Sequence, residues 1–260
     1  ESARRMRSVL SRVFRYAIAT TRADSDPTRD LQGALTAPKV RHLAAITEPK
    51  RAGDLLRAIE GYNGHGVTLL ALRLSPHLFV RPGELRKAEW AEFDFERAIW
   101  TIPEHKMKMR RPHRVPLSDQ VLTLFEELWG LTGAGRFCFP SFRSNRICMS
   151  ENTVNAAPRA MGFSREEMTA HGFRAMAATL LNESGHFHPD AIERQLAHVE
   201  NDGVRRAYAR GEYWDERVRM MQYWSDEIDR IRQLTPATTP RFRRVNPEVP
   251  RTAYRVGQPA

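Results

Sequence analysis

The stretch TAHGFRAMAATLL, residues 169–181, places two cationic side chains at the front of an otherwise apolar helix pattern. His171 and Arg174 stand three positions apart, so on a helix they share one face. The free amide groups in the first turn of a helix also attract an anion. The stretch therefore predicts a helix at 171–183 whose start either faces water or holds one anion with both side chains.

The segment RPGE repeats this arrangement earlier in the chain. Arg81 and Glu84 are also three positions apart, and Pro82 suits the first turn of a helix. A carboxylate there can orient a guanidinium, which can then donate two hydrogen bonds to a phosphate. Taken alone, an ordinary surface ion pair explains the segment more simply.

Two further segments carry chemically useful residues. The segment KMKMRRPHR, residues 106–114, predicts a charged turn between two strands. Such a turn can contact DNA phosphates and supply a lysine that donates a proton, or it can simply be a solvated hairpin. His198 ends a short helical pattern, and Tyr208 follows among arginines. Tyr208 is either a core residue or a nucleophile, because nearby cations lower the cost of ionising a phenol. The surrounding arginines are Arg205, Arg206 and Arg210.

The composition favours a partner that carries many negative charges. The chain has 260 residues, is 41% hydrophobic and has a formal net charge of +10. Nucleic acid is the simplest partner, although charge also serves solubility. There is no apolar run of membrane length and no secretory signal.

The two cysteines, Cys138 and Cys148, lack the spacing of a zinc finger. With so few cysteines, we expect a reducing, cytoplasmic setting.

The periodicity predicts an α+β fold, mostly helical with one small antiparallel sheet. Three segments have strand character, at 92–95, 98–102 and 114–117. Helical patterns occupy most of the remaining chain. They cover residues 3–20, 49–61, 67–79, 82–90, 119–130, 151–162, 171–183, 190–199 and 213–234, with Ser118 and Ser150 as predicted caps. Pro38 and Pro49 lie in an extended connector, which places a domain boundary near residue 40.

The order of these motifs is more specific than any one of them. R-x-x-E, a hairpin lysine, H-x-x-R, a histidine and a tyrosine follow one another, and the sequence strongly resembles the tyrosine recombinases, or phage integrases, of prophages and genomic islands. The segments that carry the resemblance are FVRPGELRKAEW, MKMRRPHRVPLS, HGFRAMAATLL, QLAH and AYAR.

The resemblance implies three regions. Residues 1–40 would be the end of a helical core-binding domain and its linker, and residues 41–234 a catalytic domain. Residues 235–260, rich in proline and arginine, would be a disordered tail. The chain opens inside helix-like sequence, so we expect a fragment that lacks upstream domains.

The resemblance also implies a role for each motif residue. Arg81 and Arg174 would stabilise the nonbridging phosphate oxygens, His198 would hydrogen-bond the phosphate, and Glu84 would support Arg81. Tyr208 would form a 3′-phosphotyrosyl bond, assisted by His171, and Lys108 would protonate the leaving 5′ oxygen. Lys106 remains the alternative general acid. The residues expected to contact DNA are Lys106, Arg110, Arg111, Arg205 and Arg206.

The expected activity is site-specific recombination that integrates or excises a mobile element. Cations and a tyrosine can supply this chemistry, so we expect no metal and no cofactor. The expected partners are double-stranded attachment sites, other protomers in a tetramer on paired sites, and DNA-bending accessory proteins, all on bacterial or phage DNA in the nucleoid.

Three other functions fit parts of the sequence. A topoisomerase of type IB shares the tyrosine chemistry, and a non-catalytic DNA-binding regulator would share the fold. A metal site built from His186, His188 and His198 is the third, but Pro189 in GHFHPD favours a plain turn.

The helical pattern at 213–234 has two interpretations. It carries more apolar residues than one face of a solvated helix needs: Trp214, Met220, Met221, Tyr223, Trp224, Ile228 and Ile231. Either it packs on its own domain or it docks onto a neighbouring protomer. Docking would couple assembly to the position of Tyr208, which lies five residues upstream.

Overall fold

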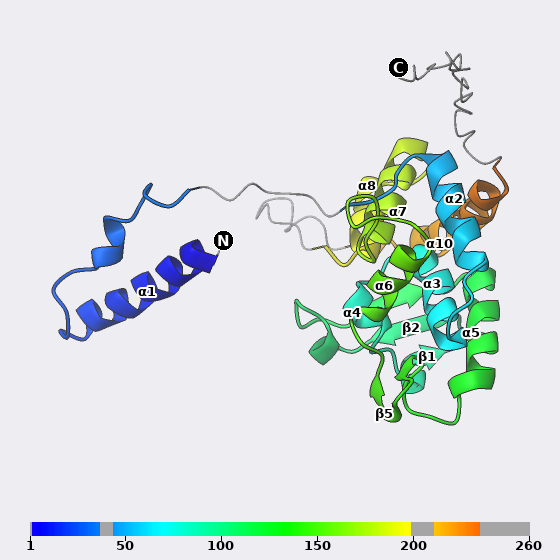
Figure 1. Cartoon of the computed structure of the whole chain (residues 1–260), viewed down its shortest axis with the longest axis horizontal. Helices are drawn as coiled ribbons and strands as arrows, with labels where there is room; N and C mark the ends of the chain where they lie inside the picture. Colours follow the sequence, from blue (N-terminus) through cyan, green and yellow to red (C-terminus); the bar gives the residue numbers. More distant parts are fainter. Residues whose placement is uncertain (1, 37–43, 199–210, 235–260) are drawn as a thin grey trace, which may run out of the picture. The chain divides into compact units, whose positions relative to one another are not determined.

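The computed structural model describes residues 2–36, 44–198 and 211–234, and the chain divides into two compact units, Glu1–Leu43 and Ala44–Ala260 (Figure 1). The predicted tail at 235–260 lies outside the described residues. No described helix is both long enough and apolar enough to cross a membrane.

The first unit contains one long helix, α1 (Ser2–Ala19), and the short 3-10 helix η1 (Pro27–Arg29). Asp26 caps η1, since its carboxylate accepts hydrogen bonds from Thr28 N at 2.9 Å and from Ser11 Oγ at 2.7 Å. These contacts tie η1 back onto α1. No described residue of α1 is buried, so its apolar side chains are uncovered within this unit.

The second unit is mostly helical with two small antiparallel sheets, which confirms the predicted α+β fold. Strands β1 (Phe93–Asp94), β2 (Ile99–Ile102) and β3 (His113–Pro116) form one sheet, in that order. Strands β4 (Pro140–Ser141) and β5 (Ser144–Cys148) form the other. The helices are α2 (Pro49–Glu60), α3 (Gly66–Leu78), α4 (Pro82–Leu85), α5 (Asp119–Thr132), α6 (Thr153–Ala160), α7 (Gly172–Ser184), α8 (Pro189–Gln195) and α10 (Trp214–Gln233), with the 3-10 helices η2 (Trp90–Glu92) and η3 (Glu104–Lys106).

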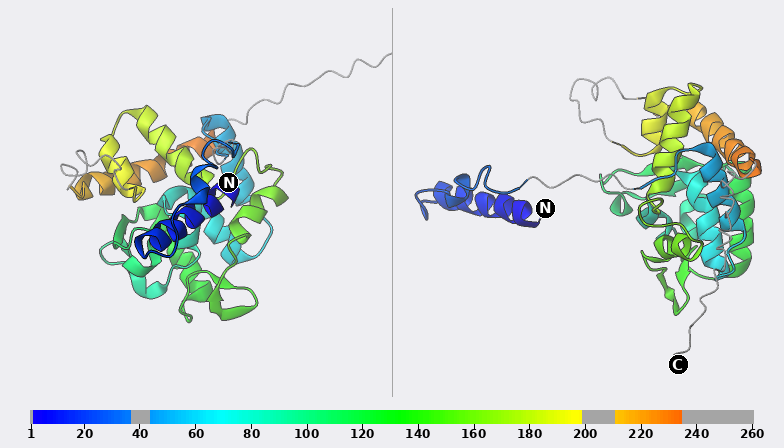
Figure 2. Two further views of the ribbon diagram at one scale, coloured as in Figure 1. Left: turned by 90° about the vertical axis from the view of Figure 1, so that its left-hand side faces the viewer. Right: turned by 45° about the horizontal axis from the view of Figure 1, so that its top comes forward.

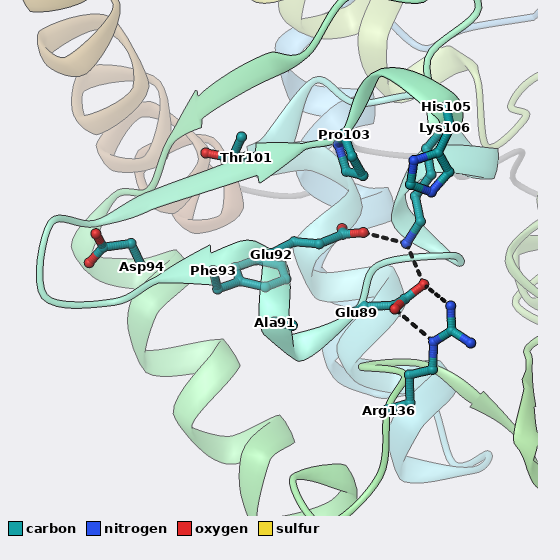
Figure 3. Close-up of a pocket in the computed structure, with 10 residues that line it drawn as sticks. All are labelled: Glu89, Ala91, Glu92, Phe93, Asp94, Thr101, Pro103, His105, Lys106 and Arg136. Atoms are coloured by element: carbon teal, nitrogen blue, oxygen red, sulfur yellow. Dashed lines mark hydrogen bonds and ion pairs between the residues drawn. The ribbon is translucent and has the colours of Figure 1, made fainter.

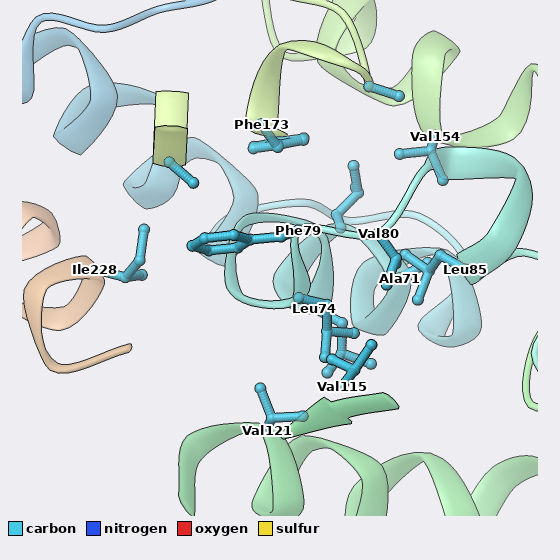
Figure 4. Close-up of a cluster of buried hydrophobic side chains, with 14 of the residues drawn as sticks. Ala71, Leu74, Phe79, Val80, Leu85, Val115, Val121, Val154, Phe173 and Ile228 are labelled. Carbon is cyan, nitrogen blue, oxygen red and sulfur yellow. The ribbon is translucent and has the colours of Figure 1, made fainter. Parts of the chain in front are cut away.

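A single hydrophobic core joins these elements. Figure 4 shows side chains from α3, α5, α7 and α10 converging on it, among them Leu74, Val121, Phe173 and Ile228. Each of these four is at most 2% exposed. Burial alternates along β2, because Trp100 and Ile102 point into the core while Thr101 is exposed.

The last helix, α10, packs on its own unit. It runs beside α2 (Figures 1 and 2), and Met220, Met221 and Trp224 are at most 1% exposed. Trp224 Nε1 donates a hydrogen bond to the Pro76 carbonyl at 2.7 Å. Gly53 allows the close approach of α2, because a Cβ there would lie 2.5 Å from the Ile231 carbonyl oxygen. The apolar face of α10 is therefore covered within its own unit, as the first of the two interpretations predicts.

Three local predictions also need correction. The helix predicted over 82–90 ends at Leu85, because the chain then pairs with a distant segment: Trp90 N donates to the Arg136 carbonyl at 3.1 Å. The β4–β5 hairpin was not predicted. Ser150 does not cap α6, which begins at Thr153 after Asn152.

Candidate active site

Arg81 is presented by the sharp turn that ends α3. Phe79 adopts a left-handed conformation with φ of 61°, which stops the helix and turns the chain toward Pro82, the first residue of α4. Glu84 then reaches back to Arg81 twice: Oε2 accepts from the Arg81 backbone N and Oε1 from Nη1, both at 2.7 Å. Glu84 is only 6% exposed, so it fixes both the backbone and the guanidinium of Arg81.

Arg174 lies in the first turn of α7 and is 4% exposed. Gly172 lets α7 begin there, since a Cβ on it would lie 2.5 Å from the Ala44 carbonyl oxygen. The Arg174 guanidinium donates to the carbonyls of Phe79 and, at 2.7 Å, Leu196. Burial, and then the charge of Arg81, lower the Arg174 pKa to about 10. The side chain therefore still carries its charge at neutral pH.

The end of α8 brings His198 to the same two arginines. Arg174 Nη2 lies 3.3 Å from His198 Nε2, and Arg81 Nη2 donates to the Ala197 carbonyl at 3.5 Å. Because a guanidinium only donates, His198 Nε2 accepts and its Nδ1 carries the proton. That proton points to Glu193 Oε2, 2.7 Å away.

His171 caps the start of α7 and faces the same charges. Its pKa is lowered, first by burial and then by Arg174, Arg81 and His198, while Glu84 opposes the shift. A neutral imidazole is thus favoured, and it is free to accept a proton. The structure brings together Arg81, Glu84, His171, Arg174 and His198, which the sequence spreads over 118 positions (81–198).

The two candidate general acids lie in different environments. Lys106 Nζ contacts Glu92 and is 2.7 Å from Glu89 Oε1, as Figure 3 shows, and it also donates to the Lys87 carbonyl at 2.8 Å. Its side chain is only 10% exposed. A hydrogen bond from Arg136 is the main cause that lowers the Glu89 pKa to about 2, so this carboxylate is charged. Lys108, in contrast, is exposed in the turn between β2 and β3.

The remaining candidates are either exposed or outside the described residues. Arg110 and Arg111 are exposed in the same turn as Lys108. Tyr208, Arg205 and Arg206 lie outside the described residues.

The histidines of the proposed metal site are engaged in other contacts. His188 Nδ1 accepts from Asp190 N at 3.2 Å, and the His186 ring lies 5.2 Å from the ring of Tyr223. Within residues 2–36, 44–198 and 211–234, no three histidine, cysteine or acidic side chains are grouped to hold a metal ion.

Comparisons with known proteins identify the family. A model of the phage integrase family matches residues 47–213, and a model of the phage integrase central domain matches residues 1–34. The chain belongs to the phage integrase family.

The relatives of this chain include proteins of phages and prophages. It is 41% identical over 241 residues to the integrase of Enterobacteria phage P4, which covers 87% of this chain and 55% of that protein. Prophage integrase IntA of Escherichia coli K12 is 36% identical, with 88% of this chain and 54% of that protein covered. The chain thus spans little more than half the length of these relatives.

Solved structures support the fold. Lambda integrase (residues 75–356) bound to DNA matches with a TM-score of 0.57 and 22% identity, over 84% of this chain and 75% of that one. The Tn1549 transposon integrase in complex with circular intermediate DNA matches with a TM-score of 0.58 and 14% identity, over 80% and 74%.

Some residues of the candidate site carried no signal in the sequence. Glu193 orients His198, but the two are five positions apart and match no motif. A buried polar cluster of His113, Gln195 and Arg217 adjoins the arginines, and its members come from three distant segments. The one signal that could have identified these residues is that they are polar and yet buried, and burial cannot be read from the sequence.

Proposed function

We propose that this integrase carries the catalytic part of a site-specific DNA recombinase, which cleaves and rejoins DNA through a 3′-phosphotyrosyl bond. The observation that supports it most is the convergence of Arg81, Arg174 and His198 on one point. The three groups come from the start of α4, the start of α7 and the turn after α8. Among the described residues, one carboxylate, that of Glu84, pairs with these two guanidiniums, so the pair keeps a net positive charge that suits a phosphate.

In the proposed reaction, Tyr208 attacks the scissile phosphorus while its phenolic proton passes to His171. Arg81 and Arg174 offset the charge on the nonbridging oxygens, and His198 adds a hydrogen bond. Lys108 gives a proton to the 5′ oxygen as it leaves, so each charge that develops is balanced. The reverse steps rejoin the strand, and the phosphotyrosyl bond conserves the energy that ligation needs.

The proposal assigns residues 41–234 to the catalytic domain and residues 1–40 to the end of the core-binding domain and its linker. Exposed Arg110 and Arg111 would contact the DNA backbone, as would Arg205 and Arg206. Lys106 is better explained as a structural residue, because Glu89 and Glu92 already hold its ammonium group.

The proposed partners are double-stranded attachment sites and further copies of the integrase. One related structure shows a lambda integrase tetramer bound to a Holliday junction, which supports a tetramer on paired sites. DNA-bending accessory proteins would complete the assembly, on bacterial or phage DNA in the cytoplasm.

A nicked suicide substrate of the natural attachment site tests the proposal. Cleavage near the nick releases a short strand, so ligation is blocked and the covalent protein–DNA adduct accumulates. We expect an adduct with the natural protein and none with Tyr208→Phe. A natural protein that binds this DNA without forming an adduct would contradict the proposal and favour the non-catalytic regulator.

Strand exchange between two attachment sites separates recombination from simple relaxation. We expect recombinant products from paired sites. Relaxation of supercoiled DNA without any exchange would instead indicate a topoisomerase of type IB.

A further inference from the structure

A buried polar cluster lies directly behind the candidate active site. It consists of His113 at the start of β3, Gln195 at the end of α8 and Arg217 in the first turns of α10, which are 8%, 0% and 3% exposed. Arg217 Nε donates to Gln195 Oε1 at 2.8 Å, and its Nη2 donates to the Arg114 carbonyl. His113 Nε2 lies 3.1 Å from the Gln195 carbonyl oxygen. Since that oxygen only accepts, His113 carries its proton on Nε2.

The cluster contacts the turn 195–198, whose carbonyl groups accept hydrogen bonds from Arg81 and Arg174. Three consecutive carbonyls at the end of α8 accept hydrogen bonds: Gln195 O from His113, Leu196 O from Arg174 and Ala197 O from Arg81. Ala197 takes a left-handed conformation with φ of 49°, and the next residue is His198. A displacement of this turn would therefore move the hydrogen-bond acceptors of both arginines and His198 itself.

The environment of the Gln195 side chain shows which of its two polar atoms contributes to the cluster. Gln195 is completely buried, yet its Nε2 has no hydrogen-bond partner among the described residues. Such a group costs about 1–3 kcal/mol relative to a satisfied one. An apolar side chain of similar length would avoid that cost, so the contribution of the amide is its acceptor oxygen, which binds Arg217.

We propose that Gln195 and Arg217 are positioning residues for the integrase reaction. They fix the turn 195–198 so that Arg81, Arg174 and His198 converge on the phosphate, and they themselves contact no DNA. The inference rests on the proposed function, because it assigns these three residues to the phosphate.

The matched variants Gln195→Met and Gln195→Glu test this. Methionine keeps the length but removes the acceptor, whereas glutamate keeps an oxygen for Arg217 and replaces the unpartnered amide nitrogen with a second carboxylate oxygen, whose negative charge faces the Arg217 guanidinium. Single-turnover cleavage of the suicide substrate is measured at saturating DNA, together with DNA affinity and thermal unfolding. We expect Gln195→Met to slow cleavage roughly 10- to 100-fold, since a misplacement of about 1 Å costs about 100-fold, with DNA affinity unchanged. Gln195→Glu should restore most of the rate.

Ser225→Ala is the control for a general loss of stability. Ser225 is also a buried polar residue of α10, and its Oγ lies 2.7 Å from Ser118 Oγ and 2.9 Å from His77 Nδ1. This variant should lower the melting temperature without slowing cleavage. If Ser225→Ala slows cleavage as much as Gln195→Met, or if Gln195→Glu is as slow as Gln195→Met, positioning by this contact is refuted.

A second measurement does not depend on cleavage. The pKa of His171 is followed by NMR in the chain without DNA. Burial lowers this pKa most; among the described charges, Arg174, Arg81 and His198 lower it further and Glu84 raises it. In Gln195→Met, we expect this pKa to rise toward the ordinary value because the two arginines are no longer held in place, and Gln195→Glu should leave it low. The two proposals can therefore fail separately. If the natural protein forms no adduct, the proposed function is refuted. If the His171 pKa is unchanged in Gln195→Met, the positioning role is refuted.

If Gln195→Met does not fold, Arg217→Lys replaces it. Lysine keeps the charge but cannot bond to Gln195 Oε1 and the Arg114 carbonyl with a rigid fork. The same slow cleavage and raised His171 pKa are expected, and wild-type values for both would overturn the inference.

Discussion

Replacing Lys106 and Lys108 separately by methionine tests the roles proposed for the two lysines of the β2–β3 turn, structural for Lys106 and catalytic for Lys108. The side chains of Lys106, Glu89 and Glu92 are 10%, 16% and 9% exposed, so the ammonium group bridges two largely dry carboxylates. Breaking a fully buried ion pair costs roughly 3–5 kcal/mol. Here each carboxylate keeps another partner: Glu89 keeps Arg136 at 2.7 Å, and Glu92 keeps Trp100 Nε1 at 3.0 Å.

These remaining partners reduce the expected loss for Lys106→Met to about 2–3 kcal/mol. In a domain of this size, that corresponds to a fall in melting temperature of roughly 5–10 °C. Lys108 is exposed and forms no ion pair within the described part of the chain. Lys108→Met should therefore change the melting temperature by no more than about 2 °C.

For the rate of DNA cleavage we expect the opposite order of effects, with Lys108→Met more damaging than Lys106→Met. Loss of a general acid slows a reaction by about 100- to 10,000-fold, and we expect a loss of this size for Lys108→Met. A substrate with sulfur in place of the bridging 5′ oxygen removes the need for the acid, because a thiolate leaves without a proton. Lys108→Met should therefore regain most of its rate on the sulfur substrate.

The cleavage rate of Lys106→Met, assayed well below its melting temperature, should not be selectively restored by the substrate with the bridging 5′ sulfur. The reasoning is refuted if Lys106→Met melts like the natural protein. It is refuted equally if sulfur rescues Lys106→Met and leaves Lys108→Met slow, because the two lysines would then have exchanged roles.

Four further outcomes are expected. Burial lowers the pKa of His77 to about 4 and of His113 to about 3, so their contribution to stability is complete above pH 6.5 and is lost progressively as the pH falls from 6.5 toward these values. Urea unfolding at pH 6.5 and pH 5 should differ by about 3 kcal/mol, and His77→Gln should roughly halve the difference; equal stability at both values would contradict it. Truncation after Arg210 should abolish the cooperative melt seen by circular dichroism, because it removes the buried face of α10; a sharp transition in the truncated chain would count against this. Adduct formation should proceed in EDTA, and a requirement for magnesium would overturn the cationic mechanism. DNA affinity should fall at least about tenfold between roughly 50 and 200 mM salt, and an unchanged affinity would argue against phosphate contacts.

The sequence predicted best those features that depend on neighbours along the chain. Arg81 with Glu84 and His171 with Arg174 are three positions apart, and helical spacing alone brings each pair to one face. The three strands of the first sheet were predicted from segments of strand character separated by a charged turn, and β2 and β3 pair with Trp100 opposite Val115. In each case the deciding interaction lies within a few residues, where periodicity is informative.

Features that depend on distant partners could not be predicted in this way. The helix predicted over 82–90 ends early because Glu89 forms an isolated β-bridge with Phe137, 48 positions away. Lys106 was predicted to contact DNA because it lies in a basic turn, and the sequence gives no sign that Glu89 and Glu92 lie beneath it. The contact between Gln195 and Arg217 joins two helices whose proximity is a property of the whole fold.

The arrangement of Arg174 gives the last reason to interpret this site as an anion site rather than a structural hub. A guanidinium buried to 4% exposure beside a second one destabilises the folded protein, and burial and Arg81 are the two largest causes of its lowered pKa. Two carbonyls accept from Arg174, and its Nη2 also faces His198; within residues 2–36, 44–198 and 211–234, no carboxylate contacts it directly. A purely structural hub would be more stable with an acid in contact with the guanidinium. A buried guanidinium without a carboxylate in contact suits the proposed anion site, since a preorganised cation needs no reorganisation as charge develops on a bound phosphate.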